Sequence, residues 1–270
     1  MKEKSNHRPN PLLVQPMYRN GPSWERLAGE EDLFYEPLEL SMFGVNGNGT
    51  GYLEGLTWYR ESKRVRSYHG VFIDINLASG DEMIRRISRE RCKESCHNAQ
   101  DLGASRVIFH SSILPQIRGG YLENWVCACA DFYVELAERF PSLTICVENS
   151  LDVDPEPLAR LMRQATHPRV AVCLDVGHVN YGPTPLDTWF EVLSNHVEEI
   201  HLSDNCGRYD DHLPLGQGTV DWECVDKWVK LLGLPLPLTF EVGDIEGVRK
   251  SLDFLKKRSL LGLTPSETEE

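Results

Sequence analysis

From residue 65 onward, the sequence alternates between short apolar runs and longer segments with helical spacing. The apolar runs cover residues 65–70, 106–110, 143–147, 170–174, 197–202 and 237–242. Helical patterns follow them at residues 81–102, 122–140, 154–166, 185–195, 221–232 and 244–257. Short, nearly continuous apolar strands that alternate with helices are typical of a parallel sheet covered on both faces. We therefore expect six β/α units in this part of the chain.

The first 60 residues contain weaker signals for two more units. Residues 11–17 and 38–43 are apolar enough for strands, and residues 23–31 have the pattern of a helix. The glycine-rich residues 44–51 predict a loop, which lacks the G-K-[ST] ending of a phosphate-binding loop. Eight units in a chain of 270 residues favour an α/β fold closed into a (β/α)8 TIM barrel. A doubly wound open sheet is the alternative, but no dinucleotide-binding fingerprint supports it.

We expect the barrel to be a single domain over residues 11–260. Residues 1–10 predict a loose N-terminal tail, and residues 261–270 predict a disordered acidic tail. No apolar run reaches the roughly 18 residues of a membrane span, and the N-terminus has no signal-peptide pattern. A cytoplasmic location is therefore expected. The eight cysteines include Cys146 and Cys173 inside strand-like runs, which favours free thiols in a core over disulfides.

Residues that can bind metals gather where the predicted strands end. The strand-end residues are His69, His110, Glu148, Asp175, His201 and Glu241, and the following loops add His178, Asp210 and His212. Taken singly, each is more typical of a hydrogen-bonded packing residue than of a ligand. A TIM barrel, however, directs all its strand ends at one central place. Carboxylates brought together there would repel one another unless metal ions lie between them, and imidazole and carboxylate groups suit Zn²⁺ or Mn²⁺.

Five motifs occur in a characteristic order. They are VEN at 147–149, CLDVGH at 173–178, IHLSDN at 200–205, DxHLPLGQG at 210–218 and FE at 240–241. Together they resemble the xylose isomerase-like TIM-barrel superfamily, and the resemblance extends over residues 60–258. This group contains sugar isomerases and epimerases, and also the abasic-site nuclease endonuclease IV. The resemblance implies a (β/α)8 fold and a divalent metal cofactor, zinc or manganese.

The resemblance implies a different set of metal ligands for each branch of the group. The epimerase branch binds one divalent metal through two Glu, one Asp and one His, which match Glu148, Glu241, Asp175 and His201. The endonuclease IV branch binds three zinc ions with further ligands, which match His69, His110, His178, Asp210 and His212. All nine positions carry suitable residue types in this sequence.

Two reactions fit these residues. The first is isomerisation or epimerisation of a sugar, sugar phosphate or related polyol, in which a metal chelates adjacent oxygens and stabilises an enediolate. Glu148 and Glu241 would then move the proton as general acid and base, and His178 would hydrogen-bond a substrate oxygen. The second reaction is hydrolysis of a phosphodiester at abasic DNA sites by a metal cluster, as in an AP endonuclease.

The distribution of charge favours the sugar reaction. The formal net charge of −13 opposes attraction to nucleic acid. The loop after His201 holds a single basic residue, Arg208, and residues 44–51 carry no charge. Proteins that follow a DNA backbone need basic and aromatic residues in such loops. We therefore expect a small-molecule carbohydrate as the substrate, with abasic DNA as the alternative. A non-catalytic barrel is disfavoured, because no expected ligand is missing.

Overall fold

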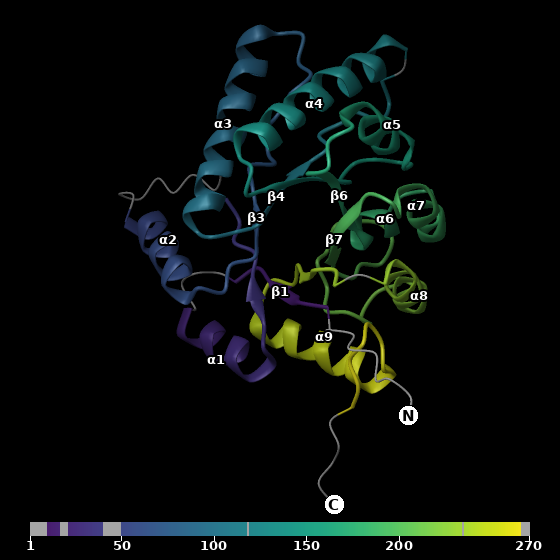
Figure 1. Cartoon of the computed structure of the whole chain (residues 1–270). Coiled ribbons are helices and arrows are strands. Elements are labelled where there is room, and N and C mark those ends of the chain that lie inside the picture. Colours follow the sequence, from purple (N-terminus) through teal and green to yellow (C-terminus); the bar gives the residue numbers. More distant parts are fainter. Residues whose placement is uncertain (1–9, 17–20, 40–49, 118, 234, 266–270) are drawn as a thin grey trace, which may run out of the picture.

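The structure is a computed structural model that describes residues 10–16, 21–39, 50–117, 119–233 and 235–265. In Figure 1 the helices surround a central set of strands. The strands are β1 (Leu12–Val14), β2 (Phe34–Tyr35), β3 (Ser67–His69), β4 (Arg106–His110), β5 (Thr144–Glu148), β6 (Val170–Asp175), β7 (Val197–Leu202) and β8 (Leu238–Phe240). The helices are α1 (Gly21–Glu31), α2 (Thr50–Ser62), α3 (Glu82–Asp101), α4 (Gly120–Arg139), α5 (Glu156–Ala165), α6 (Val176–Asn180), α7 (Leu186–Leu193), α8 (Trp222–Leu232) and α9 (Ile245–Arg258).

The strands form one parallel sheet that closes on itself. Their order in the sheet is β2-β1-β8-β7-β6-β5-β4-β3, and each neighbouring pair is parallel. Isolated parallel bridges join the two edges, from Tyr35 to Val65 and from Leu38 to His69. The Tyr35 N–H also donates to the Arg64 carbonyl at 2.9 Å. The predicted (β/α)8 TIM barrel is thereby confirmed.

The six strands predicted after residue 65 are confirmed, with ends that differ by up to two residues. The predicted position of the second strand is wrong, because β2 lies at Phe34–Tyr35 rather than at residues 38–43. Pro37, which comes shortly after β2, has no N–H group to donate to the neighbouring strand β3. The hydrogen-bonded ladder is interrupted there, and Leu38 forms only an isolated bridge with His69. Residues 40–43 lie outside the described part of the chain.

Two helices were not expected from the sequence. Helix α2 begins at Thr50, inside the predicted glycine-rich loop, of which residues 44–49 lie outside the described residues. The short α6 begins directly after β6, and the Asp175 carboxylate caps it by accepting from the His178 N–H at 2.6 Å. This helical turn places His178 against the end of β6, because the cap fixes the direction in which the chain leaves the strand.

The barrel interior has one apolar side and one polar side. Strand side chains alternate between two faces, so each residue two positions before a strand-end ligand also faces inward. On β4, β5 and β6 these residues are Ile108, Cys146 and Cys173, which form a small cluster separate from the main core. On β3, β7 and β8 they are Ser67, Glu199 and Thr239, all fully buried. TIM barrels usually fill this layer with branched apolar residues, so the polar half needs a specific explanation.

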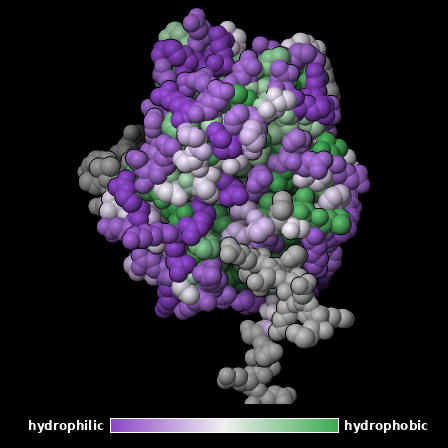
Figure 2. Space-filling view, viewed as in Figure 1, coloured by the Kyte–Doolittle hydropathy of each residue, from purple (hydrophilic) through white to green (hydrophobic). Residues whose placement is uncertain are grey.

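The main core lies between the strands and the surrounding helices, and it includes Trp24, Trp125 and Trp189. The face of the molecule in Figure 2 is largely hydrophilic, with smaller areas of hydrophobic residues between. No helix within the described ranges is long and apolar enough to cross a membrane. All eight cysteines are free thiols.

The predicted N-terminal tail falls on residues 1–9 apart from Asn10, and half of the predicted C-terminal tail falls on residues 266–270; both ranges lie outside the described part of the chain. The chain beyond α9 is packed against the main core as far as Leu263, and the Leu261 N–H donates to Asp226 at 2.8 Å.

Candidate metal centre

All nine predicted ligand residues meet at the carboxyl end of the barrel. Six stand at the ends of β3 to β8 or directly after them, His178 lies in α6, and Asp210 and His212 lie in the β7–α8 connection. Glu148 is at the centre of the set and is fully buried. Its carboxylate oxygens lie 3.2 Å from His69 Nε2, 3.5 Å from His110 Nε2, 3.3 Å from His178 Nδ1 and 3.4 Å from His201 Nδ1.

The donor atoms fall into two main groups. In the first group, which we call the strand group, Glu148, Asp175, His201 and Glu241 each offer one atom, and these atoms lie within 4.8 Å of one another. The second group, which we call the loop group, consists of His178, Asp210 and His212, whose donor atoms also lie within 4.8 Å of one another. The strand group is buried, whereas the Asp210 and His212 side chains are 40% and 37% exposed. The loop group therefore faces the opening of the site, above the strand group.

Several polar atoms of the strand group are buried but make no hydrogen bond. They are Glu148 Oε1, Asp175 Oδ2 and His201 Nδ1. Buried polar atoms almost always have a partner, and one that lacks it costs free energy. Three such atoms beside the Glu241 carboxylate form a set of nitrogen and oxygen donors, which is the set that Zn²⁺ or Mn²⁺ binds. The residues present therefore fit a divalent cation.

Three of the histidines are oriented by backbone carbonyl groups. The Nδ1 atoms of His69, His178 and His212 lie 3.1, 2.7 and 2.7 Å from the carbonyl oxygens of Gly70, Asn149 and Glu241, respectively. Because a carbonyl only accepts, each Nδ1 carries the proton and each Nε2 is directed at a carboxylate. These carboxylates are Glu148 for His69 and Asp210 for the other two. Such hydrogen bonds commonly fix the tautomer of a metal-binding histidine.

The sequence reasoning missed three polar residues next to the strand group: Glu36 and Glu199, which are buried, and Gln15, which is half-buried. Glu36 follows β2, and its Oε1 lies 3.1 Å from His201 Nε2. Gln15 follows β1 and donates through Nε2 to both Glu36, at 2.8 Å, and Glu241. Glu199 accepts from the Ser67 hydroxyl at 2.6 Å and from the Thr239 hydroxyl at 2.7 Å. The alternation of β7 could have revealed Glu199, which lies two residues before His201. Glu36 had no such signal, because its strand was placed too late.

Charges at the centre are strongly coupled. Burial would raise the pKa of Glu148, but the neighbouring imidazoles, that of His201 above all, outweigh burial and hold it well below its usual range. Burial raises the pKa of Asp175 to about 7, partly offset by His178. Burial lowers the pKa of His110 to about 4. Without a cation, the carboxylates are balanced by protons on other imidazoles. A divalent cation supplies the same positive charge and leaves the ring nitrogens free to act as ligands.

The loop group is held in place by a buried carboxylate. Asp204, which follows β7, accepts from the N–H groups of Asn205, Gly216 and Val220 and from the Trp222 indole, at 2.8–3.1 Å. It also forms an antiparallel bridge with Leu213. His212 itself has a φ of 47°, in the left-handed region that few side chains adopt. The surrounding contacts must therefore enforce its position.

We expect Asp204→Ala to lower the free energy of unfolding by about 3 kcal/mol, because several buried donors lose their acceptor. Chemical denaturation measures this change. The matched control is Asp221→Ala, which removes the cap of α8 at the Cys224 N–H and should cost about 1 kcal/mol. Equal losses in the two variants would contradict the anchoring role of Asp204.

The site opens into a cavity of about 260 Å³. Its lining residues are Gln15, Leu38, His69, Phe72, His110, His178, Asp210, His212, Glu241, Val242 and Gly243. Glu241 reaches this cavity, whereas Glu148 is not among the lining residues. The lining contains no Lys or Arg within the described part of the chain.

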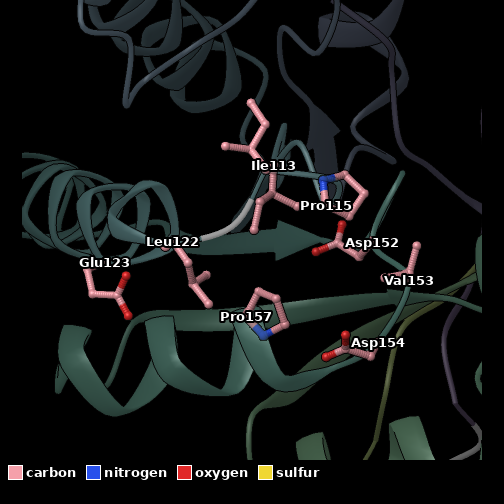
Figure 3. A pocket seen from close by; sticks show the side chains of 10 residues that line it. Ile113, Pro115, Leu122, Glu123, Asp152, Val153, Asp154 and Pro157 are labelled. Atoms are coloured by element: carbon pink, nitrogen blue, oxygen red, sulfur yellow. The ribbon is translucent and has the colours of Figure 1, made fainter.

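A second cavity, of about 190 Å³, lies between the β4–α4 and β5–α5 connections. Figure 3 shows Asp152 and Asp154 with Ile113, Pro115 and Leu122 around it. Asp152 joins the two connections by accepting from the Ser111 hydroxyl and from the Ser150 N–H. None of the nine predicted ligands lines this cavity, so it is separate from the metal centre.

A family model described as "Xylose isomerase-like TIM barrel" matches residues 56–258. The chain belongs to this family. An uncharacterized protein of Methanocaldococcus jannaschii is 27% identical over 202 residues, which cover 70% of this chain and 68% of that protein. A probable endonuclease 4 of Mycobacterium leprae is 24% identical over 202 residues, covering 68% and 75% of the two chains.

Solved structures of xylose isomerase-like barrels share the fold. A D-tagatose 3-epimerase-like protein superposes with a TM-score of 0.75 at 23% identity, over 92% of this chain and 96% of that one. The family and its neighbours are enzymes, and they include both epimerases and endonuclease IV-like proteins. The nine donor residues of this chain thus stand at the carboxyl ends of the barrel strands, where enzymes of this fold carry their sites.

Proposed function

We propose that this protein is a divalent-metal-dependent isomerase or epimerase of a sugar or related polyol. The observation that carries the proposal is the combination of a buried four-donor strand group with a small cavity that has no Lys or Arg in its described lining. A cavity of about 260 Å³ suits a ligand with few non-hydrogen atoms. A polyanionic ligand would need basic partners in that wall.

Each residue of the strand group has a part in the proposed reaction. Glu148, Asp175, His201 and Glu241 would hold the cation, which supplies Lewis acidity at adjacent carbonyl and hydroxyl oxygens of the sugar. Glu241 lines the cavity and takes the proton from the carbon beside the carbonyl. Glu148 is the proposed acid–base partner, and it would return a proton to the substrate after first taking one up, because the neighbouring imidazoles keep its resting carboxyl ionised. His178, which also lines the cavity, hydrogen-bonds a substrate oxygen.

The direct test is proton exchange with solvent. The purified protein, loaded with Mn²⁺ or Zn²⁺, is incubated with a panel of uncharged ketoses and aldoses in D₂O and followed by NMR. We expect deuterium to enter at the carbon beside the carbonyl of at least one sugar, together with the isomer or epimer. A metal-loaded protein that exchanges no proton in any sugar of the panel would contradict the proposal.

Glu241→Gln should slow this exchange by about a hundredfold to ten-thousandfold, the usual contribution of a positioned general base. The amide keeps the size of the side chain and its acceptor for Gln15, but it cannot take a proton. The matched control is Glu39→Gln, a buried glutamate that contacts Tyr68, Ser95 and Asn98 outside the barrel interior. An exchange rate that stays the same in Glu241→Gln would remove Glu241 from the mechanism.

A second candidate function is hydrolysis of DNA at abasic sites. The loop group favours it, because an enzyme with one metal ion has no need for three further clustered donors. The relatives described as probable endonuclease 4 support it as well. Metal analysis separates the two functions when combined with cleavage of an abasic-site duplex. Three ions per chain with cleavage indicate the nuclease, and a single ion with sugar exchange indicates the isomerase or epimerase.

A further inference from the structure

His201 differs from His69, His178 and His212 in what its two ring nitrogens contact. His69, His178 and His212 direct Nε2 at a carboxylate, and backbone carbonyls hold their Nδ1 atoms. In His201 both ring nitrogens face carboxylates. Its Nδ1 lies 3.4 Å from Glu148 and 3.2 Å from Glu241, and its Nε2 points down into the barrel. On that side Nε2 contacts a carboxylate instead of a backbone carbonyl.

That carboxylate is Glu36, which is fully buried. Its Oε1 and Oε2 lie 3.1 and 3.3 Å from His201 Nε2. Gln15 donates to Oε1 at 2.8 Å, and the Thr239 hydroxyl lies 3.4 Å from Oε2. Because Gln15 and Thr239 also contact the Glu36 carboxylate, its orientation toward His201 Nε2 is fixed.

We propose that Glu36 is a positioning residue for the metal centre, because it keeps the proton of His201 on Nε2 and so presents Nδ1 as the ligand atom. Two observations carry this step independently of each other. Nε2 contacts the Glu36 carboxylate, whereas Nδ1 faces the Glu148 and Glu241 carboxylates of the strand group without a well-aligned hydrogen bond to either. A carboxylate behind a ligand imidazole also makes the opposite ring nitrogen a stronger electron donor. Among the described histidines of the centre, only His201 is supported by a charged side chain below the metal position.

Gln15 extends the effect of Glu36 to a second ligand. Its amide donates both to Glu36 and to Glu241. This role accounts for the polar side of the barrel interior. The Thr239 hydroxyl lies between the Glu36 and Glu199 carboxylates, and the Ser67 hydroxyl donates to Glu199, so the polar groups next to Glu36 have hydrogen-bond partners. The inference rests on the proposed metal centre, but it does not depend on which substrate the enzyme uses.

The test compares Glu36→Gln with Glu39→Gln in the full-length protein. The two glutamates are 0% and 2% exposed and lie three residues apart, but the Glu39 carboxylate contacts α3 rather than the donor atoms of the metal centre. The dissociation constant for Zn²⁺ is measured by competition with a chelating dye, without substrate. We expect Glu36→Gln to weaken zinc binding by about 10- to 100-fold, the usual effect of losing such a partner, and Glu39→Gln to leave it unchanged.

A spectroscopic measurement tests the tautomer directly. Long-range ¹H–¹⁵N spectra of the zinc-loaded protein should show His201 bound through Nδ1 and protonated at Nε2. Coordination through Nε2 would overturn the proposal, as would wild-type zinc affinity in Glu36→Gln or an equal loss in Glu39→Gln. Should Glu36→Gln not fold, Glu36→Asp withdraws the carboxylate by one methylene and must still weaken zinc binding.

The outcomes also separate this inference from the proposed function. A wild-type protein that binds no zinc would overturn the metal centre itself, and with it the role of Glu36. Normal zinc binding without sugar exchange would overturn the proposed function and leave the role of Glu36 standing.

Discussion

Glu148→Gln should lower turnover by at least about a thousandfold, because one change removes both the proposed acid–base group and a proposed metal ligand. The reason is the central position of Glu148, whose two oxygens face four imidazoles. The amide has nearly the same volume as the carboxylate, so the barrel should remain folded. Its NH₂ group, however, cannot act as a ligand and would face ring nitrogens. The measurements are sugar exchange and zinc content per chain.

Asp152→Asn provides the matched control for this variant. Asp152 is also a buried carboxylate after β5, and burial raises its pKa to about 6. An asparagine oxygen can still accept from Ser111 and Ser150, so activity and zinc content should remain close to the wild type. If Glu148→Gln kept its activity, the strand group could not be the catalytic centre in either of the two reactions.

Removal of the metal should lower the melting temperature by about 8–16 °C. A ligand present at about a thousand times its dissociation constant stabilises the folded state by about 4 kcal/mol. In a chain of this size, each kcal/mol shifts the melting temperature by about 2–4 °C. The physical source is the strand group, in which buried carboxylates stand close together and several donor atoms make no hydrogen bond. Calorimetry with and without a chelator measures the shift.

Adding the metal back provides the control for chelation. Zn²⁺ or Mn²⁺ should restore the melting temperature, whereas Mg²⁺, which prefers oxygen ligands and retains its water, should restore less of it. Identical melting curves before and after chelation would mean that the donors are satisfied by hydrogen bonds alone.

The sequence predicted the barrel, and it also predicted that the nine candidate ligand residues lie together at the strand ends, for a physical reason. Buried parallel strands are read as continuous apolar runs, so a His or Glu that interrupts such a run marks the point where the strand emerges at the site. His110 and Glu148 are the last residues of β4 and β5, and both were identified in this way. The fold then brings these residues together, because all eight strands point in the same direction.

The support beneath the site was harder to predict. Strand β2 has only two residues, too few for a periodic pattern, so the position of Glu36 at its end had no signal. Glu198 and Glu199 are neighbours in the sequence, but only Glu199 is buried, because alternate residues of β7 face opposite sides. The interior side of β7 is the side of His201, and Glu199 shares it because the two residues lie two positions apart. Gln15 was also missed, because it reaches Glu241 only through the pairing of β1 with β8, which are far apart in the sequence.

The two groups of donors differ in what carries them, and this difference bears on how such an enzyme could change over time. The strand group belongs to the framework of the barrel, whereas Asp210 and His212 belong to a segment that Asp204 fastens at both ends. The residues between its two attachment points can therefore be replaced without changing the strands that carry the strand group. Descendants of one ancestral barrel could thus acquire new reactions by loop replacement, while the buried half of the centre is inherited intact.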